Sequence, residues 1–210
     1  MQNHAQDAKG RGRPPKQRGD KLLTREMLVH VGTEVLTEKG YSAVGVDEIL
    51  QRTGISRCSF YFFKTKEGFG AELIDRYRLS ITQKLERCLS DTSLSPLGSL
   101  RAFVGEVRDE MARTDCRSGC LAGKLAQEVN TLPENFREQL SAVFAEWQDV
   151  FAHGLKRAQE TGEISPELDC ASTAAFFWYG WEGALQRANL ELNIKPVDIF
   201  IGNFFSRLTG

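Results

Sequence analysis

The chain has 210 residues, of which 41% are hydrophobic, 26% charged and 10% aromatic. This composition is typical of one or two globular domains, and it excludes the collagen-like, disordered and disulfide-scaffold classes. The sequence contains no apolar run long enough to span a membrane, and its polar N-terminus lacks the apolar segment of a secretory signal. Five cysteines, an odd number, indicate reduced thiols, so we expect a cytoplasmic protein.

The formal net charge of −1 hides an excess of positive charge at the start of the chain. Residues 1–70 hold twelve Lys and Arg against eight Asp and Glu. Basic side chains are densest from Lys9 to Arg25, a segment in which Asp20 is the one acid. An arm of this kind is expected where a protein meets a polyanion, and a solvated tail is the alternative.

Residues 1–20 are rich in Gly and Pro and have no apolar periodicity, so we expect a disordered basic arm. Within this arm, the segment Arg11-Gly12-Arg13-Pro14 carries two guanidinium groups on a backbone that the proline keeps extended. Such groups fit a narrow A·T-rich minor groove. We therefore predict that Arg11 and Arg13 contact DNA.

Residues 21–70 have the pattern of three helices. Apolar residues recur at steps of three and four residues in the first helix, at Leu22, Leu23, Met27, Val31, Val35 and Leu36. This helix ends at Lys39-Gly40, where a basic last turn meets a glycine. A second helix is predicted over 46–52, and a third begins with Ser56 as its N-cap. Two short helices around a turn with a glycine are the helix-turn-helix pattern.

Residues 71–210 are predicted to form a second, helical domain. Periodicity and the capping residues Ser95 and Asp169 place further helices over 65–89, 96–113, 120–129, 133–160, 170–190 and 196–208. The β-branched residues never alternate over more than a few positions, so no strand is expected. The sequence therefore predicts an all-α fold.

Four side chains at the start of the third helix are the predicted DNA-reading residues: Ser56, Arg57, Ser59 and Tyr61. Arg57 can bridge guanine or contact a phosphate, and Tyr61 can present its ring to a thymine methyl. Ser59 can reach a base or the backbone. Phe60 and Phe63 are expected to face the core. For each polar residue taken alone, solvated surface or simple packing is the alternative.

Several motifs together resemble the DNA-binding domain of the tetracycline-repressor (TetR) family of regulators, over about residues 21–70. They are Glu38-Lys39-Gly40-Tyr41, Val46-Asp47-Glu48-Ile49, Gly54-Ile55-Ser56, Ser59-Phe60-Tyr61 and Phe63-Lys64-Thr65-Lys66-Glu67. The resemblance implies that Lys66, at the start of the fourth helix, touches a DNA phosphate. It also implies a homodimer on double-stranded operator DNA, with two recognition helices about one helical turn of DNA apart.

The sequence departs from the family pattern at two positions. Only Phe62 separates Tyr61 from Phe63, where the family usually has two residues, so the recognition helix is one residue short. Since one residue rotates a helix by about 100°, we expect the turn that follows to absorb the change. Cys58 stands where the family commonly has Gly.

The resemblance implies that residues 71–210 are a regulatory and dimerisation domain. The last two predicted helices are unusually aromatic, and the resemblance implies that they form a four-helix bundle with a second copy. Trp178 and Trp181 are candidate walls of a ligand pocket, in which Glu182 would orient a small polar ligand. Packing in the core or in the dimer is the alternative for both rings.

Cys120 is the candidate sensor residue. A thiol in the first turn of a helix meets unpaired N–H groups and the helix dipole, which favour a thiolate. Lys124, one turn further on, and Arg117, just before the helix, would add to this effect. We therefore predict a lowered pKa and a nucleophilic thiol, and a small buried hydrophobic residue is the alternative.

The region around Cys120, together with Leu132-Pro133 and Gly180-Trp181-Glu182-Gly183-Ala184, resembles acrylate-utilisation (AcuR-like) regulators. The cysteine segment resembles, more distantly, electrophile-sensing (NemR-like) repressors. The resemblance implies a repressor that leaves its operator when a small unsaturated or electrophilic inducer is bound or sensed. We expect it in the cytoplasm, associated with the nucleoid when bound to DNA, and without contact with a membrane.

Other function classes have less support. Three isolated His residues provide no zinc spacing, and no nucleophile elbow or phosphate-binding glycine loop occurs, so an enzyme, a metal or a cofactor is not expected. A transcriptional activator, or a helical interaction module that has lost DNA binding, remains the alternative. Salt-dependent retention on heparin that depends on the basic arm would separate a DNA-binding protein from an interaction module.

Overall fold

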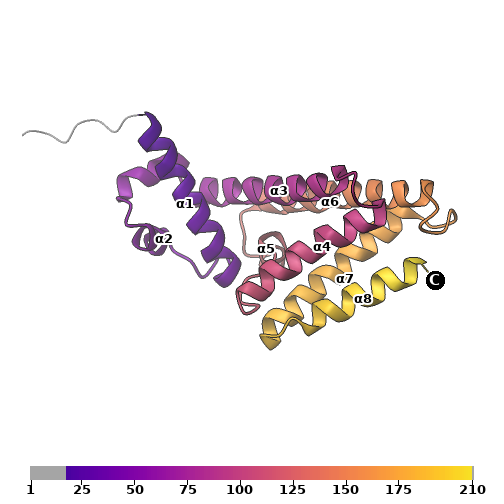
Figure 1. Ribbon diagram of the computed structural model, residues 1–210. Helices are drawn as coiled ribbons and strands as arrows, with labels where there is room; N and C mark the ends of the chain where they lie inside the picture. The colour runs from indigo at the N-terminus through magenta and orange to yellow at the C-terminus, as the bar shows by residue number, and fades with distance from the viewer. Residues whose placement is uncertain (1–17, 210) are drawn as a thin grey trace, which may run out of the picture.

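The computed structural model describes residues 18–209, and all the regular structure in that range is helical (Figure 1). In chain order the elements are α1 (Arg18–Lys39), α2 (Val46–Thr53), the 3₁₀ helix η1 (Arg57–Phe63), α3 (Lys66–Ser90), α4 (Pro96–Arg113), α5 (Leu121–Gln127), α6 (Glu134–Glu160), α7 (Cys170–Glu191) and α8 (Lys195–Thr209). The all-α prediction is confirmed. The predicted contacts of Arg11 and Arg13 fall outside the described residues.

α1 starts at Arg18 rather than at Lys21, and its apolar pattern is only partly buried. Leu22, Leu23 and Met27, expected to face a core, are 60%, 71% and 51% exposed. The start of α1 extends beyond the rest of the molecule, where no other described element covers it (Figure 1). The periodic pattern therefore predicts the helix correctly but not the extent of its buried face.

The expected recognition helix is a 3₁₀ helix and not an α-helix, which corrects the sequence prediction. It is followed by Lys64 at φ 62° and ψ −52°, and the Thr65 N–H donates to the Phe63 carbonyl over 2.7 Å. This is a three-residue γ-turn of the rare positive-φ form. The missing residue is thus absorbed by tighter winding of η1 and by this strained turn.

Helices α3 to α8 pack into one helical bundle, and the N-terminal helices lie at one end of it (Figure 1). Two predicted N-caps are present: Ser95 and Asp169 accept backbone N–H groups at the starts of α4 and α7. Thr65 caps α3 in the same way. α3 is continuous through residues 66–90, so the predicted domain boundary near residue 70 lies inside a helix. Between residues 18 and 209, no helix is long and apolar enough to cross a membrane.

Candidate DNA-binding surface and effector cavity

η1 presents polar side chains outward and aromatic side chains inward. Tyr61 is 84% exposed, whereas Phe60 and Phe63 are buried and pack their rings on Phe69 of α3. Arg57 forms a 2.9 Å ion pair with Asp47 of α2, and both side chains are mostly exposed. Because an exposed ion pair contributes little free energy, exchanging Asp47 for a DNA group would cost Arg57 little.

Ser56 and Lys66 have local partners that the sequence did not predict. Ser56 stands at the N-cap position of η1 but makes no capping hydrogen bond; its hydroxyl lies 3.5 Å from that of the half-buried Ser59. The Lys66 ammonium lies over the Tyr41 ring and donates to the Tyr41 carbonyl over 2.9 Å. Burial lowers the pKa of Lys66. This hydrogen bond uses one of the three N–H donors of the ammonium, and the other two are candidates for contact with a DNA phosphate.

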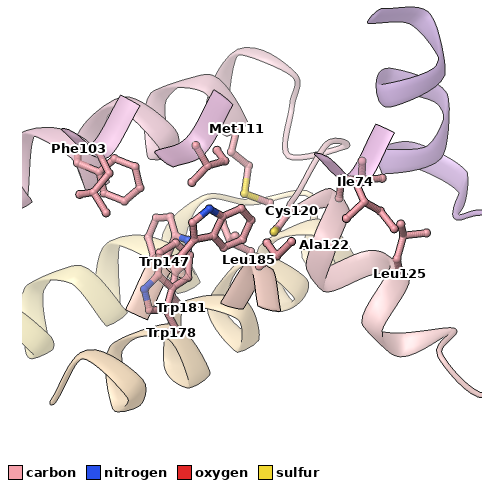
Figure 2. Packing of buried hydrophobic residues seen from close by; sticks show 14 of the residues in the cluster. Ile74, Phe103, Met111, Cys120, Ala122, Leu125, Trp147, Trp178, Trp181 and Leu185 are labelled. Carbon is pink, nitrogen blue, oxygen red and sulfur yellow. The ribbon is translucent and has the colours of Figure 1, made fainter. Parts of the chain in front are cut away.

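Three tryptophans gather beside Cys120 in the centre of the bundle (Figure 2). Trp178 stacks on Trp147 with the ring centroids 5.1 Å apart, and Trp181 stacks on Phe177 at 5.7 Å. Trp178 and Trp181 are each 2% exposed. The rings therefore build the core, and the same rings also form a wall of a cavity.

This cavity, which we call the α1-facing cavity, has a volume of about 430 Å³ and lies between α1, α3, α4 and α7. Its lining includes Thr33 and Thr37 of α1, Tyr77 and Lys84 of α3, Phe103 and Met111 of α4, Arg117, Cys120, Trp147, Trp178 and Trp181. The volume suits a small organic ligand. Since α1 also belongs to the helix-turn-helix, a ligand here touches both halves of the molecule.

Cys120 is buried, and the prediction of a lowered thiol pKa is wrong. The thiol caps α5 by accepting the Gly123 N–H at 3.4 Å, as the sequence suggested. However, burial raises its pKa well above the ordinary value, and the nearby Glu182 carboxyl raises it further. Desolvation therefore outweighs the helix N-terminus, and the thiol is protonated at neutral pH.

Glu182 is the second unexpected titrating group in this region. Burial raises the pKa of its carboxyl to about 7, although a hydrogen bond with Cys120 acts in the opposite direction. A Cβ atom on Gly123 would lie 1.8 Å from Glu182 Oε2, so only glycine leaves room for the carboxyl against α5. The buried Tyr77 hydroxyl also bonds to Cys120. Tyr77, Cys120 and Glu182 thus form one buried polar cluster.

The five predicted sensor residues are brought together, but in more than one cavity. Lys124 lines a second space of about 420 Å³ with Cys120 and Glu182, and it does not line the α1-facing cavity. Trp178 and Trp181 lie on the α1-facing side. Cys120 lines both spaces and stands at their junction.

Glu128, at the C-cap of α5, is a functional candidate that the sequence analysis missed. Its carboxylate accepts the N–H groups of Tyr41 and Ser42 at 3.2 and 2.8 Å, in the turn that follows α1. Gly40, at φ 82°, leaves room for it, because a Cβ there would lie 1.8 Å from Glu128 Oε1. α5 therefore connects the buried cluster at its start to the helix-turn-helix at its end.

Comparison with known proteins agrees with this architecture. Residues 28–73 match the family described as bacterial regulatory proteins, tetR family, and residues 96–204 match the tetracyclin repressor-like C-terminal domain. The chain belongs to the TetR family. It is a transcriptional regulator with an N-terminal helix-turn-helix and a C-terminal helical domain, as the resemblance in the sequence indicated.

Two named relatives cover most of the TetR-family chain. The transcriptional regulator AcuR of Cereibacter sphaeroides is 44% identical, covering 92% of this chain and 89% of AcuR. The repressor DhaR of Mycobacterium sp. strain GP1 is 30% identical, covering 88% and 91%. These relatives are named as regulators of transcription and not as enzymes, in agreement with the sequence prediction.

Two solved structures share the fold. A regulatory protein TetR from Rhodobacter sphaeroides has a TM-score of 0.84 at 43% identity, covering 87% of this chain and 97% of that one. The reduced form of Escherichia coli NemR has a TM-score of 0.78 at 22% identity, covering 89% and 97%, and at that identity it supports the fold alone. In the described part of the chain, no three His, Cys, Asp or Glu side chains are grouped to hold a metal ion.

Proposed function

We propose that this TetR-family regulator is a homodimeric repressor that leaves its operator when a small unsaturated, acrylate-like compound occupies the α1-facing cavity. The observation that carries the proposal is the lining of this cavity, in which Thr33 and Thr37 of the helix-turn-helix domain face Cys120, Trp178 and Trp181. A ligand in this cavity loses or gains contacts when α1 moves, so its affinity differs between the arrangement of the domains that binds DNA and the one that does not. Only such a difference in affinity can shift the equilibrium between the two arrangements.

The DNA contact is assigned to the outer face of η1. Arg57 and Tyr61 are exposed there, Ser56 and Ser59 lie beside them, and Lys66 stands at the N-terminus of α3. Arg11 and Arg13 would reach the adjacent minor groove from the arm. A shorter, 3₁₀ recognition helix presents fewer side chains to the major groove, so phosphate contacts carry a larger share of the affinity.

The dimer is assigned to the outer face of α7 and α8, where large apolar side chains remain uncovered. They are Phe176, Tyr179, Leu190 and Ile199, between 54% and 74% exposed. Gly183 of α7 and Gly202 of α8 have open space beside them, which allows another helix to approach closely. An apolar, self-complementary face of this kind is typical of an isologous interface.

Arg117 lines the α1-facing cavity and can pair with a ligand carboxylate. Lys84 also lines it but pairs there with Glu110, and Glu34 and Glu38 are further acids of the lining. Because the Cys120 thiol is protonated and buried, reversible binding is favoured over covalent addition. Addition would form an S–C bond at the β-carbon while Glu182 takes the thiol proton and passes it to the α-carbon.

A binding measurement on promoter DNA from the region flanking its own gene tests the repressor. Arg57→Ala should weaken binding about five- to fiftyfold, because a base or phosphate contact is lost. Arg87→Ala is the matched control, since Arg87 is also an exposed arginine paired with an acid, Glu106, at the far end of α3. Equal affinity of both variants, or no retained duplex at low salt, contradicts the proposal.

A release experiment with Cys120→Ser separates the two modes of effector action. With reversible binding, acrylate and its saturated analogue propionate both release DNA, and the serine variant still responds. With covalent addition, only acrylate releases DNA, and the mass of the wild-type chain rises by one acrylate. The serine variant then releases no DNA with either compound. If neither compound releases the operator from the wild type, the acrylate-like inducer is wrong.

A further inference from the structure

Two buried polar atoms in the described part of the chain lack a hydrogen-bond partner, and both belong to α7. They are Trp178 Nε1 and Glu182 Oε1. Trp178 is 2% exposed, and Glu182 Oε1 is buried although the residue as a whole is half-buried. Native proteins rarely leave such groups unpaired, because each costs a full desolvation penalty. An unpaired donor and an unpaired acceptor on residues one helical turn apart therefore point to a missing partner.

Both residues line one further cavity, which shares Trp178 with the α1-facing cavity and Glu182 with the space that Lys124 lines. This cavity, which we call the α6-facing cavity, has a volume of about 500 Å³ and lies between α5, α6 and α7. Its lining residues are Gly123, Ala126, Gln127, Ser141, Phe144, Ala145, Gln148, Trp178, Tyr179, Glu182 and Gln186. The lining is mostly apolar, with three glutamines and no Lys or Arg, so the walls offer amide groups but no positive charge.

The two unpaired atoms are complementary in hydrogen bonding. The indole N–H of Trp178 can only donate, and Glu182 Oε1 accepts when the carboxyl is ionised. The residues are one helical turn apart on α7, so their side chains are neighbours on one face of the helix, and a planar carboxamide offers one acceptor and a donor group to the two atoms. When Glu182 is ionised, a carboxylate ligand lacks the donor that Oε1 needs, and no cation of the lining offsets the charge of the two carboxylates.

We propose that the α6-facing cavity is a second effector site, which binds the uncharged carboxamide group of a small molecule between Trp178 and Glu182. The ligand carbonyl accepts the Trp178 N–H, and its NH₂ group donates to Glu182 Oε1. The other carboxyl oxygen of Glu182 faces Gly123 of α5, and the carboxyl bonds to Cys120. A bound ligand would therefore displace the start of α5 through Glu182. The other end of α5 is bonded to the turn after α1 through Glu128.

The test follows the three indole N–H signals of the ¹⁵N-labelled full-length protein while propionamide or propionate is added at about pH 8. The chain has three tryptophans, so each signal is assigned with one Trp→Phe variant. Propionamide should shift the Trp178 signal downfield and saturate, as expected when the indole gains an acceptor. Propionate, an anion of the same size and shape, should bind this site at least about tenfold more weakly.

Two alanines of α6 provide matched variants that do not disturb the core. Ala145 and Ala142 are both exposed, but only Ala145 lines the α6-facing cavity. Ala145→Phe should abolish the propionamide shift, and Ala142→Phe should leave its midpoint within about twofold. Glu182→Gln should weaken propionamide about three- to tenfold, because a neutral amide accepts less strongly than a carboxylate.

Three results would overturn the second site. The first is no shift of the Trp178 signal at about 100 mM propionamide, where so small a ligand should bind if its hydrogen bonds are made. The second is an unchanged midpoint in Ala145→Phe. The third is propionate binding as tightly as propionamide at about pH 8. Because no operator DNA is used, these results are independent of the repressor proposal.

Discussion

At the residue scale, Lys64 and Glu182 are in energetically unfavourable positions, and both lie in regions with a proposed function. Lys64 occupies a positive-φ γ-turn directly after the DNA-facing helix, and non-glycine residues in such conformations cost about 1–3 kcal/mol. Glu182 is buried without a cation beside it, and burial raises its pKa to about 7. Neither feature stabilises the folded chain, so each is a position where a substitution should be informative.

Lys64→Gly should stabilise the protein by about 0.5–1 kcal/mol, because glycine adopts positive φ without a Cβ clash. Urea denaturation monitored by tryptophan fluorescence measures the change. Lys39→Gly is the contrasting control: Lys39 ends α1 in helical conformation, so glycine there should destabilise. A loss of stability in Lys64→Gly would mean that the turn is not strained.

Glu182 should make the protein less stable as the pH rises from about 4.5 to 7. Its pKa is raised in the folded state, so the folded chain holds a proton in this range that the unfolded chain has released. The loss is on the order of 3 kcal/mol and levels off above pH 7. In Glu182→Gln this part of the pH dependence should vanish. Parallel pH profiles of the free energy of unfolding in both proteins would contradict the assignment.

At the element scale, α5 is the shortest α-helix of the C-terminal half and has anchors at both ends. Cys120 at its start bonds to Tyr77 and Glu182, and Glu128 at its end holds two backbone N–H groups after α1. A displacement of a short helix with anchored ends is transmitted along its axis, since the backbone hydrogen bonds keep its length. α5 is therefore the element expected to couple the cavities to the DNA-binding helices.

Glu128→Ala should reduce the effect of inducer on operator affinity by about five- to twentyfold, because two charge-assisted hydrogen bonds to the helix-turn-helix are lost. The ratio of operator dissociation constants with and without inducer, from fluorescence anisotropy, measures this coupling. Thr131→Ala is the control, since it removes hydroxyl contacts with Ser42 and with the Glu128 backbone carbonyl but leaves the Glu128 carboxylate and its two hydrogen bonds in place. If both variants keep the wild-type ratio, α5 does not transmit the signal through Glu128.

At the scale of the whole molecule, α7 and α8 have two roles. Their inner faces carry Phe177, Trp181 and Phe204 in the core, and their outer faces leave aromatic and aliphatic side chains exposed. Hydrophobic burial is roughly proportional to the apolar area removed from water, so these outer faces gain free energy by covering one another. The proposed dimer would place two η1 helices on one DNA duplex.

Phe176→Arg should convert the dimer into a monomer and weaken operator binding about 100-fold or more, because one recognition helix alone loses the second half-site. Sedimentation equilibrium and anisotropy measure the two effects. Leu94→Arg is the control, since Leu94 is also an exposed apolar residue but lies in the turn between α3 and α4. A Phe176→Arg protein that stays dimeric would place the interface elsewhere.

Properties that depend on neighbours in sequence could be read from the sequence alone. Helix periodicity, the caps at Ser95 and Asp169, and the buried Phe60 and Phe63 were all predicted, as was the TetR-family architecture. Each of these depends on side-chain spacing along one helix or on a backbone group two or three residues away. The shortened end of the recognition helix was visible for the same reason.

Properties that depend on distant residues were decided only by the tertiary structure. The pKa shift of Cys120 was predicted in the wrong direction. The helix N-terminus is a local feature, whereas the burial of the thiol and its contact with Glu182 depend on residues elsewhere in the chain. The exposure of Leu22 and the contact of Glu128 with the turn after α1 have the same origin. Desolvation and long-range hydrogen bonds depend on which helices pack against one another. The spacing of residues along the chain does not show which helices those are.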